Sequence, residues 1–350
     1  MNKKIKYAIN GAAIGAGAAT LLNTIKQCQQ MNQDPTKLFD WQELLTQAGK
    51  GALIGGGAGL GIGAIVDYQN SQETPINTDA FLYSIINNVS LNKSTNIEFS
   101  RLDSKANKVI SIIKRNVGHL LAEEPTRLGS TEKGTALSNK FDIDIGLLFK
   151  PGSFSSTEKM YSYLLNLFER RIGKESIIDV RDQKKSIGVV FLLFNKEYKI
   201  DVVPNKQSFS DETAGYLFVN NGSNSTYTKT DFKALKSIRY SKTQKEIIVL
   251  LKHWKQKHDL PLSSHLLENL VKDAYVYNSI PKSFTKKVIM VMKHIRDNLD
   301  CITIRSIENT NNILTNISDS KKQDIISACN KAIKEYEYQP NSVVETFKVK

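Results

Sequence analysis

The spacing of apolar and polar residues separates a glycine-rich beginning, a middle part with strand-like alternation and a long helical end. Helical spacing covers most of residues 80–122 and a segment near 156–171, and it continues after about residue 229. Strands are expected where apolar and polar residues alternate, near residues 141–149, 177–181, 187–194, 198–203 and 215–219. The pattern therefore predicts an α+β fold in which a mixed sheet precedes a helical lobe.

The first 68 residues contain two uncharged segments that are rich in glycine and alanine. Glycine or alanine recurs at every fourth position within residues 7–22 and 51–66. On a helix this spacing makes a smooth face that a second helix can approach closely. We therefore expect a glycine-zipper helical hairpin over residues 1–68, followed by a polar linker over residues 69–79.

The sequence does not decide whether this hairpin is soluble or associated with a membrane. Each uncharged segment has sixteen residues, whereas a membrane span needs about 20. A soluble hairpin that self-associates through residues 7–66 and a membrane-associated hairpin both agree with this length. The three lysines among the first six residues favour a cytoplasmic N-terminus. We expect a cytoplasmic protein, with tethering to the inner face of the cell membrane as the membrane alternative.

Composition and charge narrow the function classes. The chain is 40% hydrophobic and 24% charged, as in globular proteins, and its formal net charge of +13 attracts nucleotides, nucleic acid or an anionic membrane surface. Solubility alone also accounts for such a charge. The three cysteines are far apart, which predicts a reducing compartment and no disulfide framework. The five histidines lack the spacing of a zinc site.

Two aspartates interrupt an otherwise apolar strand. Asp142 and Asp144 alternate with apolar residues, so both carboxylates share one face of the strand. Two such charges repel each other unless a cation lies between them, and Mg²⁺ prefers carboxylate and phosphate oxygens. A solvated strand face is the simpler alternative, but the apolar run over residues 146–149 favours a central strand and hence a metal site.

A Gly-Ser pair, Gly129 and Ser130, precedes these aspartates in a polar segment. Its backbone N–H groups and hydroxyl suit a turn that binds phosphate oxygens. The stretch GSTEKGTALSNKFDIDIGLLF, residues 129–149, resembles the active-site motif of the polymerase-β-like nucleotidyltransferases, in which Gly-Ser is followed by Asp-x-Asp on a strand. The resemblance implies a third carboxylate on a neighbouring strand, and the segment KEYKIDVVPNK supplies Asp201.

Later segments resemble the branch of this superfamily that contains the oligoadenylate-synthase-like and cyclic-GMP-AMP-synthase-like enzymes. An aromatic residue before a Thr-Asp turn, here Tyr227, is implied to stack on a base. A Lys-x-Trp motif and a Ser-(aromatic)-x-x-Glu motif imply phosphate contacts for Lys252 and Ser264. The residues alone leave an alternative for each. Tyr227 is then a packed loop aromatic, Lys252 an exposed helix lysine, and Ser264 the cap of the helix that begins near His265.

The resemblance implies a two-metal nucleotidyltransferase with a palm domain over residues 80–228 and a helical lobe over 229–350. Mg²⁺ (or Mn²⁺) is the implied cofactor. The implied metal ligands and catalytic residues are Asp142, Asp144 and Asp201, and the implied nucleotide-binding residues are Gly129, Ser130, Tyr227, Lys252 and Ser264.

Three functions agree with this site. The first is synthesis of a cyclic or short linear oligonucleotide signal from nucleoside triphosphates in antiviral defence, with a downstream effector protein. The second is template-independent extension of an RNA, DNA or protein hydroxyl, or nucleotidylation of a small molecule. The third is a non-catalytic, membrane-tethered nucleotide sensor, which the presence of three carboxylates disfavours. Nucleic acid is expected either as an activator or as an acceptor.

Overall fold

The computed structural model describes residues 76–210 and 214–349 of the chain. The expected glycine-zipper hairpin, with its membrane and self-association roles, lies outside the described residues. Within the described ranges, no helix combines the length and the apolar character that a membrane crossing requires. The described residues divide into two compact units: residues 76–88, 282–286 and 332–349 belong to the first, and residues 89–210, 214–281 and 287–331 belong to the second.

The described part of the first unit consists of helices and their caps. It contains most of α5 (Thr78–Val89), the start of α12 (Phe284–Asn298), the end of α13 (Asp319–Tyr338), the 3-10 helix η3 (Pro340–Ser342) and α14 (Val343–Phe347). The carboxylate of Asp79 accepts hydrogen bonds from the backbone N–H groups of Phe284 and Thr285. It therefore satisfies two of the free donors at the start of α12.

The described residues of the second unit form one mixed sheet of seven strands, in the order β1-β2-β5-β4-β3, with β6 paired to β5 and β7 paired to β6. The strands are β1 (Thr126–Leu128), β2 (Ile143–Phe149), β3 (Ile177–Asp182), β4 (Ile187–Leu193), β5 (Lys196–Gln207), β6 (Ala214–Val219) and β7 (Thr226–Asp231). The pair of β2 and β5 is parallel, and the other pairs are antiparallel.

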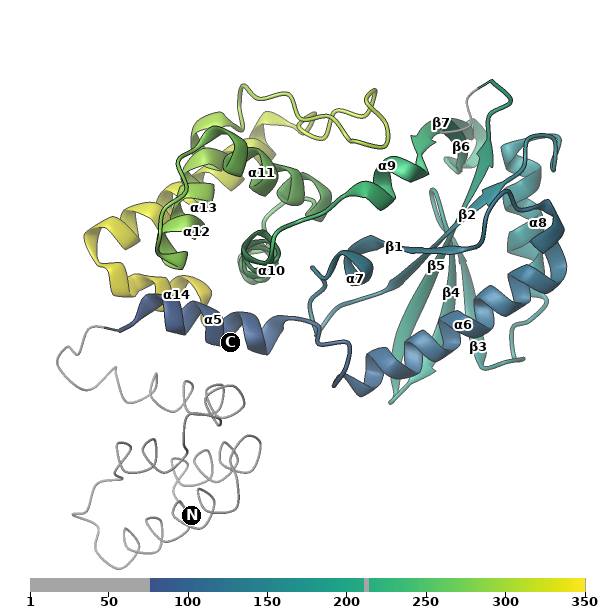
Figure 1. Ribbon diagram of the computed structural model, residues 1–350, viewed down its shortest axis with the longest axis horizontal. Coiled ribbons are helices and arrows are strands. Elements are labelled where there is room, and N and C mark those ends of the chain that lie inside the picture. Colours follow the sequence, from purple (N-terminus) through teal and green to yellow (C-terminus); the bar gives the residue numbers. More distant parts are fainter. Residues whose placement is uncertain (1–75, 211–213, 350) are drawn as a thin grey trace, which may run out of the picture. The chain divides into compact units, whose positions relative to one another are not determined.

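Two helices cover one face of this sheet. Helix α6 (Ile97–Val117) and helix α8 (Thr157–Glu169) pack on the strands through their apolar stripes (Figure 1). The buried side chains that meet them come from alternate strand positions, Ile143, Ile145 and Leu147 of β2 and Tyr198, Ile200 and Val202 of β5. Because side chains alternate along a strand, the intervening residues face the other side of the sheet, away from α6 and α8.

The remaining elements of the second unit are mainly helical. They are the 3-10 helices η1 (Gly118–Leu120) and η2 (Gly222–Asn224), the helices α7 (Gly129–Lys133), α9 (Phe232–Ser237), α10 (Lys242–Lys257) and α11 (Ser264–Tyr277), and the larger parts of α12 and α13. A capping box of Ser241 and Gln244 begins α10, and the side chain of Asp231 caps α9.

Three elements differ from the sequence-based expectation. The chain forms β1 and α7 around Gly129, where only a turn was expected, and β7 extends the sheet to Asp231. The sequence TYTKTD of β7 lacks apolar alternation because this edge strand is partly exposed and the residue that it buries, Thr230, is polar. The five strands and the helix expected between residues 141 and 219 are all present.

Candidate active site

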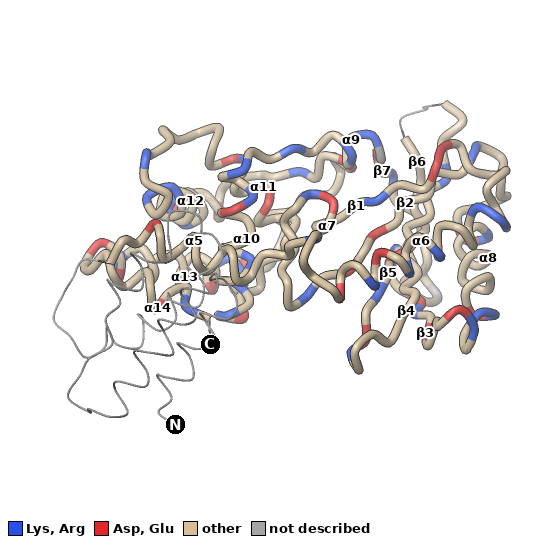
Figure 2. Tube along the Cα trace, turned by 60° about the horizontal axis from the view of Figure 1, so that its bottom comes forward, with Lys and Arg blue, Asp and Glu red and all other residues tan. Residues whose placement is uncertain are grey.

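The open side of the sheet borders a pocket of about 1270 Å³ within the second unit. Strands β1, β2 and β5 and helices α7, α10 and α11 supply its walls, and both carboxylates and lysines line it. Because both kinds of charge line it, the pocket is a site of mixed charge. The rest of the described chain also has acidic and basic residues interspersed (Figure 2).

Parallel pairing of β2 with β5 brings the expected carboxylates together. Asp144 and Asp201 are direct register partners in this pair, and Asp142 lies two residues before Asp144, next to the start of β2. All three belong to the strand face that α6 and α8 leave open. The sheet thus gathers the three predicted carboxylates, of which the third comes from a segment more than fifty residues later.

The charges of these carboxylates are only partly compensated. Burial, and then the neighbouring charges of Asp142 and Asp201, raise the pKa of Asp144 to about 7. Burial also raises the pKa of Asp201, against the effect of Lys199. The Oδ1 atom of Asp201 is buried and has no hydrogen-bond partner of good geometry among the described residues, although the nearby side chain of Gln183 also lowers the pKa of Asp201. An unpaired buried carboxylate oxygen indicates a site that requires a further positive group.

Among the described residues, Lys199 is the lysine that forms ion pairs with this cluster. Its Nζ lies 2.8 Å from Oδ2 of Asp201 and 4.0 Å from Oδ2 of Asp142. As the structure stands, no group of three or more Asp, Glu, His or Cys side chains within the described residues is arranged to hold a metal ion. The donor set still fits a hard divalent cation, because it consists of carboxylate oxygens, one of them unpartnered. The chemistry fits Mg²⁺, and the Lys199 ammonium stands where carboxylate ligands would converge.

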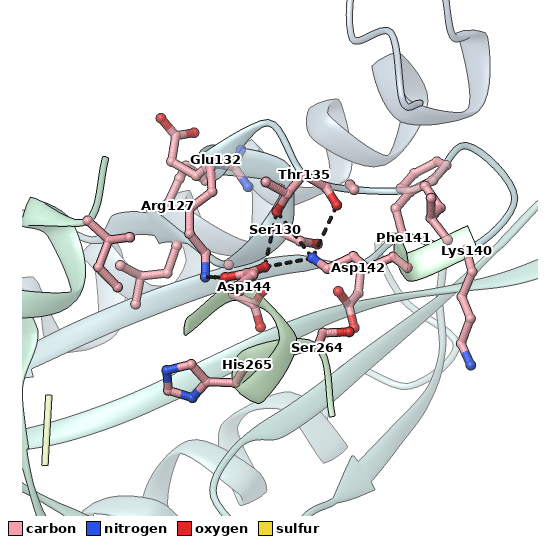
Figure 3. A pocket seen from close by; sticks show the side chains of 18 of the residues that line it. Arg127, Ser130, Glu132, Thr135, Lys140, Phe141, Asp142, Asp144, Ser264 and His265 are labelled. Carbon is pink, nitrogen blue, oxygen red and sulfur yellow. Dashed lines mark hydrogen bonds and ion pairs between the residues drawn. The ribbon is translucent and has the colours of Figure 1, made fainter. Parts of the chain in front are cut away.

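Gly129 and Ser130 lie directly beside the carboxylates. Gly129 has a φ of +77°, and a Cβ at this position would lie 1.7 Å from Oδ2 of Asp144. Only glycine meets both conditions, since other residues disfavour this backbone region and their side chains would displace Asp144. Ser130 projects beside Asp142 and Asp144 (Figure 3). The Gly-Ser pair and the Asp-x-Asp pair therefore form one site.

Lys252 is held in a buried network on the other wall of the pocket. Its Nζ lies 2.6 Å from Oε1 of Glu268 and donates to the carbonyl and hydroxyl of Thr135 at 3.1 and 3.2 Å. Lys133 and the hydroxyl of Tyr240 donate to Oε2 of the same glutamate. Lys252 is 4% exposed and Glu268 is 2% exposed. The exposed-lysine alternative for Lys252 is therefore wrong, and its ammonium is committed to a protein partner.

The electrostatics of this network differ from those of the carboxylates. Burial lowers the pKa of Lys252, although the charge of Glu268 opposes the effect. Burial alone would raise the pKa of Glu268, but Lys252 and Lys133 hold it below its usual range. Glu268 is thus a stable carboxylate between two lysines.

Two further predicted residues occupy different environments. Ser264 is the first residue of α11 and lines the pocket, while the side chain of Ser263 caps the helix. The alternative that Ser264 is the cap is therefore wrong. Tyr227 lies on β7, is 64% exposed and packs edge-on against Tyr216, and it is not among the residues that line this pocket. Its stacking role stays a prediction.

Several pocket lysines were missed by the sequence analysis. Lys199 lies two residues before Asp201, so the alternation of side chains along a strand already places both on one face. Lys245 lies seven residues before Lys252 on α10, and its Nζ is 3.6 Å from the position of a Cβ on Gly134. Lys133 follows Ser130 on α7, and only the fold shows that it meets Glu268.

Comparison with known proteins identifies the fold. No family model matches the sequence, and no curated protein matches it. Solved structures match over most of the chain. CdnC of Escherichia coli MS115-1, in complex with HORMA-deltaN, has 18% identity, a TM-score of 0.58 and coverage of 77% of this chain and 95% of its own. The CD-NTase CdnG of Bradyrhizobium diazoefficiens, bound to GTP, has 12% identity, a TM-score of 0.56 and coverage of 78% and 95%.

Vibrio cholerae DncV in its GTP-bound form has 13% identity, a TM-score of 0.53 and coverage of 83% of this chain and 82% of its own. The chain has the nucleotidyltransferase fold. The expected α+β palm with a mixed sheet and a C-terminal helical part is confirmed. The palm and lobe boundaries at residues 80, 228 and 229 stay predictions.

Proposed function

We propose that the protein is a divalent-metal-dependent nucleotidyltransferase that joins nucleoside triphosphates into a cyclic or short linear oligonucleotide signal. One observation carries the proposal. Asp144 and Asp201 are in register on parallel strands, with Asp142 on the same face and Gly129 packed against Asp144. Gly129, Asp142 and Asp144 line a pocket on a nucleotidyltransferase fold, and Asp201 lies beside that lining as the register partner of Asp144.

In this proposal the carboxylates and the Gly-Ser pair have separate roles. Asp142, Asp144 and Asp201 would hold Mg²⁺ (or Mn²⁺), which when bound stabilises the charge on the attacking and leaving oxygens of an in-line displacement. Asp201 also orients the attacking hydroxyl and accepts its proton. Ser130 and the backbone of Gly129 bind the β- and γ-phosphates, and Ser264 faces the same phosphates across the pocket.

The structure favours a different role for Lys252. Its ammonium is bound to Glu268 and Thr135. In this proposal Lys252 therefore stabilises the pocket wall and does not itself contact phosphate. Lys245, which lines the pocket and has no ion-pair partner in the described chain, is the better candidate for direct phosphate contact. In this proposal Lys245 neutralises the phosphates that the family resemblance assigns to Lys252.

Two observations favour a signal made from two or more nucleotides. The volume of about 1270 Å³ exceeds the ~300–1,000 Å³ of typical small-molecule sites. The similar structures include a protein called a cyclic dinucleotide synthase, CdnE of Elizabethkingia meningoseptica, with GTP and Apcpp. An RNA terminal U-transferase is also similar, so extension of a nucleic-acid hydroxyl is the second candidate. We infer a cytoplasmic signal that acts through an effector protein in antiviral defence.

The test uses the full-length chain, Mg²⁺ and a mixture of α-labelled nucleoside triphosphates, with and without added RNA or DNA. Products are treated with phosphatase and identified by mass. Phosphatase-resistant oligonucleotides formed without added nucleic acid are the expected result. Label found only in elongated nucleic acid would overturn signal synthesis in favour of extension of a nucleic-acid hydroxyl. Triphosphate binding without any product would indicate a nucleotide sensor.

A further inference from the structure

The ammonium of Lys199 occupies the position between two carboxylates that are proposed to hold a metal ion. Its Nζ is 2.8 Å from Oδ2 of Asp201 and 4.0 Å from Oδ2 of Asp142. The register explains this placement: Ile143 pairs with Ile200, so Asp142 and Lys199 come one residue earlier on adjacent strands and share one face.

The neighbouring strand is shaped to let the lysine lie there. Gly188 of β4 is the register partner of Asp201, and a Cβ on Gly188 would lie 2.6 Å from Nε2 of Gln183 and 3.0 Å from Cδ of Lys199. A side chain at position 188 would therefore press on the amide of Gln183 and on the lysine stem. The absence of a side chain leaves the stem free to extend across β4 toward Asp201. Two independent features, the strand register and this glycine, thus direct Lys199 to the carboxylates.

A divalent cation and this ammonium compete for the same oxygens. Magnesium binds carboxylate oxygen at about 2.0–2.1 Å, and an ion so close to Oδ2 of Asp201 would strongly repel an ammonium already 2.8 Å from that atom. Lys199 is 27% exposed and lines the pocket, so its flexible stem can swing into the pocket space. There its charge meets the phosphates of a bound nucleotide.

We propose that Lys199 is an exchangeable internal counter-ion that makes divalent-metal binding depend on nucleotide. In the empty site it neutralises part of the charge of Asp201 and Asp142 and lowers their affinity for a free divalent ion. When nucleotide and metal enter together, the ammonium transfers from the carboxylates to the phosphates. This inference rests on the proposed metal site, and it adds a residue and a coupling that the family resemblance did not supply.

The experiment measures Mn²⁺ binding to full-length protein by calorimetry and by electron paramagnetic resonance, with and without α,β-methylene-ATP. Lys199→Met removes the charge and keeps the apolar stem, and Lys199→Gln is a second variant. Lys206→Met is the matched control, because Lys206 lies on the same strand but on the opposite face. Asp144→Asn tests whether the Mn²⁺ that is measured occupies the carboxylate site.

We expect Lys199→Met to bind Mn²⁺ about tenfold more tightly without nucleotide, since a nearby positive charge is gone. The gain in Mn²⁺ affinity on adding the nucleotide analogue should shrink by a similar factor, because the ammonium that nucleotide displaces is absent. Linkage then requires that the gain in nucleotide affinity on adding Mn²⁺ shrink by the same factor. A purely structural role for Lys199 would loosen Mn²⁺ binding and so overturn the inference, as would unchanged affinity and unchanged coupling. If Asp144→Asn binds Mn²⁺ like the wild type, the proposed metal site itself is wrong.

Discussion

Two charged clusters border the same pocket, and they differ in how completely the protein satisfies them. Glu268 accepts hydrogen bonds on both carboxylate oxygens, from Lys252 and Thr135 on one and from Lys133 and Tyr240 on the other. The carboxylates Asp142, Asp144 and Asp201 have one close ammonium, and one buried oxygen of Asp201 has no partner in the described chain. The first cluster is complete without a ligand, whereas the second requires more positive charge.

This difference indicates which cluster serves structure and which serves binding. A buried ion pair with all its hydrogen bonds is costly to break, because removing one partner leaves a buried charge alone. A ligand can supply the interaction that a partly satisfied cluster lacks, so such a cluster favours ligand binding. We therefore expect changes at Glu268 to act mainly on folding, and changes at Asp144 to act mainly on transfer.

The largest effect should follow the removal of one carboxylate charge. Asp144→Asn, and equally Asp142→Asn, should reduce nucleotidyl transfer by roughly a thousandfold, because lost charge stabilisation amounts to several kcal/mol and ~1.4 kcal/mol corresponds to a factor of ten. The thermal midpoint of the metal-free protein should not fall, since a repelling charge is lost. Turnover close to that of the wild type in either variant would contradict the site.

The second effect concerns the satisfied cluster. Glu268→Gln should lower the free energy of unfolding by about 3–5 kcal/mol, because Lys252 remains charged, buried and poorly paired. Urea unfolding measures this free energy for Glu268→Gln and for a double variant that carries Lys252→Met and Glu268→Leu. The double variant should be the more stable of the two, since it leaves no buried charge on α10 or α11. If Glu268→Gln unfolds like the wild type, the cluster is not a structural ion pair.

The pH dependence of stability should have opposite signs at the two clusters. The pKa of Asp144 is about 7 in the folded chain against 3.8 in the unfolded one, so the folded form binds more protons in this interval. The free energy of unfolding should therefore fall as pH rises from about 4 to 7. The pKa of Glu268 is lowered, so its contribution is present above about pH 4.5 and is lost in acid.

Chelator-treated protein, unfolded by urea at a series of pH values, measures both slopes. Asp144→Asn should flatten the decline between pH 4 and 7, and Glu268→Gln should flatten the loss below pH 4.5. An excess of Mn²⁺ should also flatten the first slope in the wild type, because a bound cation favours ionised carboxylates. An unchanged slope in Asp144→Asn would assign the titration to another group.

The two clusters also differ in how far the sequence could predict them. Asp142 and Asp144 were visible because a strand period of two places them on one face, and their position after Gly129 and Ser130 completed a motif. The register that sets Asp201 beside Asp144 is a tertiary property, so residues alone could only nominate Asp201.

The buried cluster was harder to predict because its partners are distant in the chain. Lys252 contacts Thr135, which is 117 residues earlier, and no local period reports such a contact. A lysine on an amphipathic helix is usually exposed, and only packing of α10 against α11 and the α7 segment shows that this one is not. Exposed edge strands such as β7 were missed for a related reason, since they bury too little apolar surface to produce alternation.

The smallest effect is expected at Tyr227, which belongs to neither cluster. A stacking aromatic contributes about 1–3 kcal/mol per base, so a base-stacking Tyr227 would raise the KM for triphosphate roughly tenfold or more when replaced by alanine. Its exposure of 64%, its packing on Tyr216 and its absence from the pocket lining argue for a local role on β7. We therefore expect Tyr227→Ala to change KM by less than about twofold and to cost at most the ~0.5–1.5 kcal/mol of an aromatic pair. Tyr227→Phe, which keeps the ring, is the control: if alanine raises KM tenfold while phenylalanine does not, the ring stacks on a base and the nucleotide extends beyond this pocket to β7.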